Sequence, residues 1–324
     1  MKSTLCLTLI CLAGSVVADQ NRYSIHSVVD PESGIPAYHY LLPSGWNASD
    51  RLNWNKQDRL APVQFTSTLT SPDGETKIEM LPPVTNAFAV KGGNLTGVLP
   101  PSKAVDALDA VFAHYHPKPQ GARKDFAKDS EVPFEVGEGT KSIGLCGVLQ
   151  VSFKENDKQY TMYLSATMYE VSKKADNGDI EGTWRIANAF AITAPNADFQ
   201  KAYTLFASVV SAEGITPRFL QLMLRALSTP AGPDLDIKAM AALGGEPTEM
   251  EKAVFDQNAT RHQQATEKIF PIFHKPATYN TEAGLMLFFG SFSVFGDSAG
   301  HITVDTDPNA EAAPGFKRLE AVKG

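Results

Sequence analysis

Residues 145–193 contain three runs in which apolar or small side chains recur at every second position: LCGVLQVSF at 145–153, YTMYLSATM at 160–168 and WRIANAFAI at 184–192. A period of two is typical of β-strands that turn one face toward a core. Short polar connectors separate the runs, and the second connector contains Asn177-Gly178, a dipeptide that favours a tight hairpin turn. The stretch therefore predicts an antiparallel meander of three strands.

The two faces of this meander differ in composition. The apolar face of the third run is predicted to contain Trp184, Ile186, Asn188, Phe190 and Ile192. The opposite face is rich in small and hydroxylated residues, and it includes Tyr163, Tyr169 and Arg185. If the helix predicted at 102–115 packs against this face, these three side chains are covered, as in an α/β/α sandwich. If no helix covers them, two tyrosines beside an arginine have the composition of a partner-binding surface.

Further strands are predicted before the meander. Residues 35–42 and 46–54 read as strands, and 63–70 and 75–81 read as a hairpin. The hairpin turn is Ser71-Pro72-Asp73-Gly74, in which proline fixes φ and glycine accepts a positive φ. These strands extend the antiparallel sheet of the meander.

The segments around these strands have weaker patterns. Residues 19–31 read as a polar lead-in, and residues 118–141 read as a charged, irregular loop. Residues 102–115 have apolar side chains at helical spacing, with Ser102 as the expected N-cap.

Helices dominate the sequence after the meander. Asn196 is the expected N-cap of a first helix that ends at Gly214, and Thr216-Pro217 begins a second. A Pro- and Gly-rich stretch at 229–247 precedes a polar helix at 248–269, of the kind that lies on a surface or bridges parts of a molecule. Short strands are predicted at 285–289, 292–295 and 301–304.

This order of elements predicts an α+β fold: an antiparallel sheet flanked by helices, followed by helices and a small C-terminal β unit. We expect a signal peptide at 1–18, a main α+β domain at 19–232, a linker with the polar helix at 233–271, and the C-terminal β unit at 272–324.

The first part of the chain resembles the PsbP/Mog1-like family. Its Pro43-Ser44-Gly45-Trp46 is similar to that family's proline-glycine-tryptophan corner, and Ser71-Pro72-Asp73-Gly74 is similar to its hairpin turn. The resemblance covers about residues 35–214 and implies an α+β module without shared catalytic residues. The remainder is similar to secreted bacterial proteins of unassigned function, on the basis of residues 280–284 and 316–319.

The N-terminal residues and the composition bear on the compartment and on possible partners. Lys2, the apolar run 5–12 and the small residues ending at Ala18 have the pattern of a secretory signal peptide, so we expect a secreted or periplasmic protein. The apolar run is shorter than the about 20 residues needed to span a bilayer, and no membrane span is expected elsewhere. A net charge of -7 without a basic cluster argues against a nucleic-acid partner.

Only one cysteine remains if residues 1–18 are removed. Cys6 and Cys11 lie within the predicted signal peptide, and Cys146 lies in the first strand of the meander, on the face opposite Leu149. A single thiol cannot form an internal disulfide. Because no activating side chain is near it in the sequence, we interpret Cys146 as a structural residue.

The usual catalytic and metal-binding motifs are incomplete in this sequence. His114 and His116 stand two apart at a helix end, where they do not share a face, so no metal site is predicted there. Asp305, Asp307 and Asn309 begin like a calcium loop that is not completed. Gly296-Asp297-Ser298-Ala299-Gly300 fits G-x-S-x-G, but it is predicted to turn a pair of strands, whereas a nucleophile elbow leads from a strand into a helix. No phosphate-binding glycine pattern occurs. The sequence predicts no catalytic residue, cofactor or metal ligand.

Two function classes therefore stay open. The first is an exported non-catalytic module that binds a protein or a polysaccharide. The second is a hydrolase with a site in a cleft between the main domain and the C-terminal β unit. A histidine within hydrogen-bond reach of both a serine or cysteine and a carboxylate would favour the hydrolase. Sequons at Asn47, Asn94 and Asn258 carry glycans only if the host modifies exported chains.

The signal-peptide pattern leads to a first testable prediction. Cleavage after Ala18 should leave Asp19 as the first residue of the exported protein, because small residues precede that bond. Intact-mass spectrometry of the exported protein measures this directly. A mass that still includes residues 1–18 would contradict the prediction.

Overall fold

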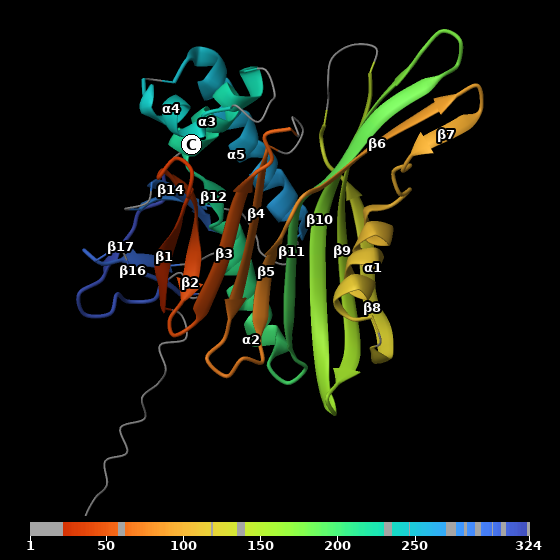
Figure 1. Ribbon diagram of the computed structural model, residues 1–324. Helices are drawn as coiled ribbons and strands as arrows, with labels where there is room; N and C mark the ends of the chain where they lie inside the picture. Colours follow the sequence, from red (N-terminus) through yellow and green to blue (C-terminus); the bar gives the residue numbers. More distant parts are fainter. Residues whose placement is uncertain are drawn as a thin grey trace, which may run out of the picture.

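The computed structural model has an α+β architecture built from antiparallel sheets, which confirms the predicted fold class (Figure 1). It describes residues 22–57, 62–117, 119–134, 140–229, 235–245, 247–269, 277–281, 284–288, 293–299, 301–305 and 309–322. The predicted signal peptide, with Cys6 and Cys11, lies outside the described residues.

The predicted meander is present. Its strands are β9 (Lys141–Glu155), β10 (Lys158–Lys174) and β11 (Ile180–Pro195), paired antiparallel along nearly their whole lengths. Asn156 and Asp157 both have positive φ between β9 and β10, as a two-residue primed hairpin turn requires. At about 3.3 Å per residue, β10 extends for roughly 55 Å, so the β10–β11 hairpin projects beyond the body of the molecule as an arm (Figure 1).

The meander belongs to a nine-stranded sheet whose main path runs β3-β4-β5-β11-β10-β9-β8. The remaining strands of this sheet are β3 (Asn47–Trp54), β4 (Val63–Thr70), β5 (Lys77–Leu81), β6 (Val84–Lys91), β7 (Asn94–Gly97) and β8 (Gln120–Glu131). Both β5 and β6 pair with β11, one after the other. Pro82 and Pro83 separate them, and neither has an N–H to donate to the ladder.

Strand β8 corrects the prediction of an irregular loop at 118–141. Its first nine residues are exposed, so the sequence lacks the apolar alternation that marks a half-buried strand. It pairs along β9 with two register shifts. Backbone pairing with the long strand β9, rather than side-chain burial, holds this segment in place.

A β-bulge in β11 corrects the predicted alternation of the third run. Asn188 has a φ of 48°, and the pairing with β10 shifts register between Ser165 and Thr167. An extra residue in one strand moves every later side chain to the other face. As a result, Trp184 packs on one side of the sheet and Phe190 on the other.

Helices cover both faces of this sheet. Helix α1 (Ala104–Tyr115) packs its Leu108 and Phe112 on the face that contains Leu149 and Leu164. Helices α2 (Phe199–Ser211) and α5 (Glu249–Ile269) cover the opposite face. Of the two arrangements considered for the helix at 102–115, packing against the face of Tyr163 does not occur, because the apolar stripe of α1 matches the more apolar face of the sheet.

A second, six-stranded sheet joins the two ends of the described chain, in the order β12-β2-β1-β16-β15-β17. Its strands are β1 (Arg22–Val29), β2 (Pro36–Pro43), β12 (Gly214–Ile215), β15 (Ser293–Gly296), β16 (His301–Asp305) and β17 (Lys317–Arg318). Residues 22–29 of the predicted lead-in thus form a strand. Because β16 pairs with β1, three strands assigned to the C-terminal β unit, β15, β16 and β17, continue the sheet of the N-terminal strands. A separate pair consists of β13 (Ala277–Thr281) and β14 (Gly284–Phe288).

The helices after the meander begin with clear capping contacts. Helix α3 (Pro217–Ser228) has Thr216 as its N-cap, which accepts a hydrogen bond from the Phe219 N–H, as predicted. A short helix α4 (Ile237–Ala242) follows. Thr248 and Glu251 form a reciprocal capping box at the start of α5, which fixes the predicted polar helix.

Two expected caps are replaced by other contacts. The Val105 N–H at the start of α1 donates to Asp129 on β8, while Ser102 reaches Asp106. Helix α2 has Asp198 at its N-cap position, and Asn196 instead accepts a hydrogen bond from Thr161.

Helix α1 approaches the sheet most closely at Gly147, and this leads to a second prediction. A Cβ at position 147 would lie 2.8 Å from the Ala104 Cβ and 2.9 Å from the Val105 nitrogen. Gly147→Val should therefore displace α1 and lower the free energy of unfolding by about 1–3 kcal/mol. Urea denaturation measures the change. Ala127→Val, on the exposed face of β8, is the matched control and should have little effect; equal midpoints for both variants would contradict the close-contact argument.

Candidate functional site

A hollow of about 560 Å³ lies at the edge of the molecule where three chain reversals meet. These are the β2–β3 corner, the β4–β5 turn and the connection from β11 to α2, at the lower edge of Figure 1. Its lining consists of Pro43, Ser44, Gly45, Trp46, Ser71, Pro72, Asp73, Thr76, Pro195, Asp198, Lys201, Ala202 and Leu205. Both motifs that the sequence singled out thus lie side by side around one space.

The first wall is the corner Pro43-Ser44-Gly45-Trp46. The Trp46 N–H donates to the Pro43 carbonyl at 3.1 Å, and Gly45 has a φ of 80°. This is the geometry of a type II turn, which requires a positive φ at its third residue and so favours glycine there. The turn carries the chain from the second sheet into the central sheet and places the half-buried Trp46 beside the hollow.

The second wall is the turn Ser71-Pro72-Asp73-Gly74. The Gly74 N–H donates to the Ser71 carbonyl at 2.9 Å, with proline at the second position and a positive φ at Gly74. Asp73 accepts hydrogen bonds from the Ser71 hydroxyl and the Glu75 N–H, and these bonds lower the pKa of its carboxyl. Asp73 therefore presents an ionised carboxylate, whose Oδ1 accepts the bonds from Ser71 and Glu75.

The third wall is the start of α2. Asp198 and Lys201 stand three residues apart in its first turn, where positions i and i+3 are neighbours on the helix surface. Neither side chain has a hydrogen bond or ion pair with another described residue. Below them, Ala202 and Leu205 extend the wall toward the core. The hollow thus combines an apolar floor with free donors and acceptors at its rim.

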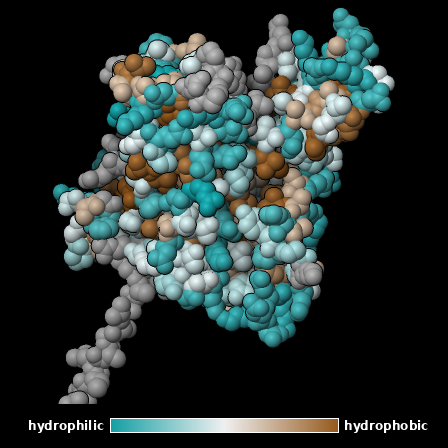
Figure 2. Space-filling model, viewed as in Figure 1, coloured by the Kyte–Doolittle hydropathy of each residue, from teal (hydrophilic) through white to brown (hydrophobic). Residues whose placement is uncertain are grey.

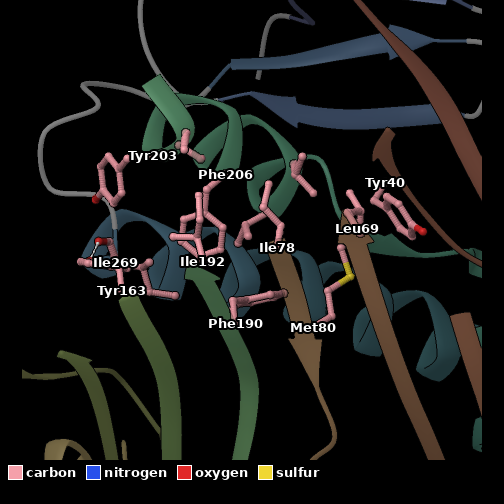
Figure 3. Packing of buried hydrophobic residues seen from close by; sticks show 14 of the residues in the cluster. Tyr40, Leu69, Ile78, Met80, Tyr163, Phe190, Ile192, Tyr203, Phe206 and Ile269 are labelled. Carbon is pink, nitrogen blue, oxygen red and sulfur yellow. Dashed lines mark hydrogen bonds between the residues drawn. The ribbon is translucent and has the colours of Figure 1, made fainter. Parts of the chain in front are cut away.

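The three predicted partner-binding residues lie elsewhere. Tyr163 is only 4% exposed; its ring meets Tyr203 of α2, and its hydroxyl donates to the Ile269 carbonyl of α5 at 2.7 Å (Figure 3). Tyr169 is half-buried against Phe134, and Arg185 is half-buried near the phenol of Tyr38. Two helices therefore cover Tyr163, whereas Tyr169 and Arg185 are only half-buried, and a partner-binding role of these residues stays a prediction.

The surroundings of Cys146 and His116 indicate structural roles for both residues. Cys146 is 2% exposed, and burial raises the pKa of its thiol to about 12, so the nucleophilic thiolate is suppressed. His116 packs its ring on Phe153 with 4.4 Å between centroids, and burial lowers its pKa. His114 is exposed on another side of the helix. In the incomplete calcium-loop pattern that begins at Asp305, residues 306–308 lie outside the described residues.

A polar network links the two sheets. His26 Nε2 lies 2.7 Å from Asp50, the Tyr40 hydroxyl donates to Asp50 at 2.7 Å, and Tyr40 also bonds to Ser67 at 3.1 Å. His26 and Tyr40 come from β1 and β2, whereas Asp50 and Ser67 come from β3 and β4. Among the described residues, His26 contacts a carboxylate but no serine or cysteine, so this network lacks the nucleophile-to-histidine contact of a hydrolase triad.

The projecting arm offers a second surface. Its tip is hydrophilic and apolar residues gather beneath it (Figure 2). Leu95, Val98 and Leu99, in and just after strand β7 of the adjoining β6–β7 hairpin, are exposed. A shallow hollow of about 470 Å³ beside them includes Glu181, which already pairs with Lys91. The hollow at the lower edge has more unpaired polar groups and is the stronger candidate site.

Comparisons with known proteins give little further information. No family model matches the chain, and no curated protein matches it. Among solved structures, the chain is similar to LpqN of Mycobacterium tuberculosis, described as involved in cell envelope biogenesis, with 15% sequence identity and a TM-score of 0.27 over 60% of this chain and 92% of that one. The PsbP/Mog1-like relationship stays a prediction. Within the described residues, no helix has the length and apolar content to cross a membrane.

The network at Asp50 gives a third prediction. Burial raises the pKa of this carboxyl, but hydrogen bonds from His26, Ser67 and Tyr40 outweigh that effect and lower the pKa below its ordinary value. Asp50→Asn should therefore lower the free energy of unfolding near neutral pH, by about 1–3 kcal/mol. The carboxylate stabilises the fold above its unfolded-state pKa of about 3.9, and this contribution is lost as the pH falls through the lower folded-state pKa.

Denaturation at several pH values tests this prediction. The difference between wild type and Asp50→Asn should be present from neutral pH to about pH 5 and should shrink in more acidic solution. Asp176→Asn, in the exposed turn between β10 and β11, is the matched control. A difference that stays the same down to pH 3 would show that Asp50 does not act through its charge.

Proposed function

We propose that this protein is an exported, non-catalytic binding module whose ligand occupies the hollow between the two turns and helix α2. The observation that carries the proposal is the hollow itself. Its volume of about 560 Å³ lies within the roughly 300–1,000 Å³ range of ligand pockets, and a few polar groups converge on an otherwise apolar lining. Export rests on the signal-peptide pattern of residues 1–18.

The chemistry of the lining supports binding over hydrolysis. A general acid needs a raised pKa, whereas the pKa of Asp73 is lowered by its hydrogen bonds. The Ser71 hydroxyl donates to that carboxylate and accepts from the Thr76 N–H, so both of its roles are structural. No histidine or cysteine is among the residues that line the hollow. The groups present are suited to holding a ligand in one orientation.

The alternative hydrolase had its predicted site between the main domain and the C-terminal β unit. At that junction Arg22, Tyr23 and Ser24 of β1 pair with Thr303, Ile302 and His301 of β16. The described residues there form a continuous ladder, which gives the alternative no support. We therefore place the ligand at the lower edge of the sheets.

A fourth prediction tests the proposed site with a side chain that fills it. Ser44 is exposed at the second position of its type II turn, where any L residue fits, so Ser44→Trp should fold while occupying the hollow. Immobilised wild-type protein should retain material from the host's extracellular and cell-surface fractions, and Ser44→Trp should lose at least tenfold of that retention. Sugar and protein assays of the eluate measure both kinds of ligand.

Asp176→Trp is the matched control because it adds the same side chain to an exposed turn at the far end of the sheet. Equal retention by both variants would refute the proposed site. New reducing ends or hydrolysed esters formed by the wild type but not by Ser44→Trp would overturn the non-catalytic assignment.

A further inference from the structure

We infer that the ligand of the hollow is a neutral saccharide, an inference that rests on the proposed function. Three properties of the lining lead to it: the balance of charge, the mixture of donors and acceptors, and the apolar wall that contains Trp46.

The charged groups disfavour an anionic ligand. Two carboxylates, Asp73 and Asp198, face the hollow with one ammonium group, Lys201. Hydrogen bonds from the Ser71 hydroxyl and the Glu75 N–H keep Asp73 ionised. Because like charges repel and a desolvated charge needs an opposite partner, a phosphate, nucleotide or acidic glycan would meet a net negative rim.

The hydrogen-bonding groups that line the hollow fit a polyhydroxylated ligand. The carboxylates of Asp73 and Asp198 only accept hydrogen bonds, Lys201 only donates them, and the hydroxyls of Ser44 and Thr76 do both. The side chains of Asp198, Lys201 and Thr76 have no hydrogen bond to another described residue, so they are free for a ligand. A saccharide hydroxyl donates and accepts at once and can satisfy each of these groups, whereas a lipid chain would leave them desolvated and unpaired.

The apolar wall matches the other surface of a sugar ring. Pro43, Trp46, Pro72 and Pro195 line the hollow with flat or rigid apolar groups. The face of an indole ring carries partial negative charge, which attracts the weakly positive C–H groups on one face of a pyranose. Fixed prolines and glycine-dependent turns hold this wall in place, so little conformational entropy is lost on binding.

A fifth prediction names the probes. Purified exported protein should bind at least one of the neutral tetrasaccharides cellotetraose, maltotetraose, xylotetraose and chitotetraose in a calorimetric titration, and should bind tetragalacturonate at least tenfold more weakly. Trp46→Ala and Asp198→Ala should each weaken the binding of the neutral sugar by about tenfold or more. Leu243→Ala, at a residue that is 76% exposed and outside the hollow, is the control and should bind like the wild type.

Trp46→Ala and Asp198→Ala differ in their expected effect on folding. Trp46 packs against the core, so its removal can impair folding; Asp198 makes no side-chain cap bond, so Asp198→Ala should unfold at the wild-type midpoint and decide the matter. Neutral-sugar binding that is unchanged in both Asp198→Ala and Ser44→Trp would overturn the inference by placing the sugar elsewhere.

The outcome also separates this inference from the proposed function. If none of the four neutral sugars binds but retention of a protein or an acidic glycan is lost in Ser44→Trp, the saccharide inference is wrong and the binding site stands. If Ser44→Trp changes the retention of nothing, the proposed function itself fails.

Discussion

The structure depends on the burial of both faces of the β9–β10–β11 meander. Alternating side chains on one strand serve two different cores: Leu164 faces α1, and its neighbour Tyr163 faces α2 and α5. Burial of apolar surface on both sides is the main favourable contribution to the folding of such a sheet. The meander is therefore the layer to which both helical layers are fixed, and the other strands of the central sheet pair outward from its edges.

The hollow follows from this layering. Once α2 is fixed over the sheet by Phe206 and its neighbours, its first turn must lie at the end of β11. The turns β2–β3 and β4–β5 reach the same edge because their strands run antiparallel beside β11. Three rigid reversals thus surround a space that no single one of them encloses. Binding sites on such turns tolerate sequence change while the sheet keeps their geometry constant.

Polar contacts between layers add specificity to apolar packing. The network around Asp50 joins β1 and β2 to β3 and β4, and the Tyr163 hydroxyl joins β10 to the last residue of α5. Each of these groups would be costly to bury without its partner. They therefore fix the relative positions of the two sheets and the covering helix, where apolar contacts alone would permit sliding.

Local sequence determined the elements with strong periodicity or specific turn chemistry. The three strands of the meander, the hairpin around Ser71-Pro72-Asp73-Gly74 and the Thr216 cap are visible in the sequence because each depends on neighbouring residues. Strand β8 could not be predicted because its exposed side chains carry no period, and β1 because it is held between β2 and β16, the latter a pairing between the two ends of the chain.

The bulge at Asn188 could not be predicted from the alternation of the third run. It exchanges the two faces of the strand, yet the residues on either side of it keep a period of two. For the candidate site, the sequence determined the shape of each turn, through Gly45 and Gly74, whose positive φ values suit glycine. Only the tertiary structure brought the turns together with Asp198 and Lys201, because their proximity depends on strand pairing between residues more than a hundred positions apart.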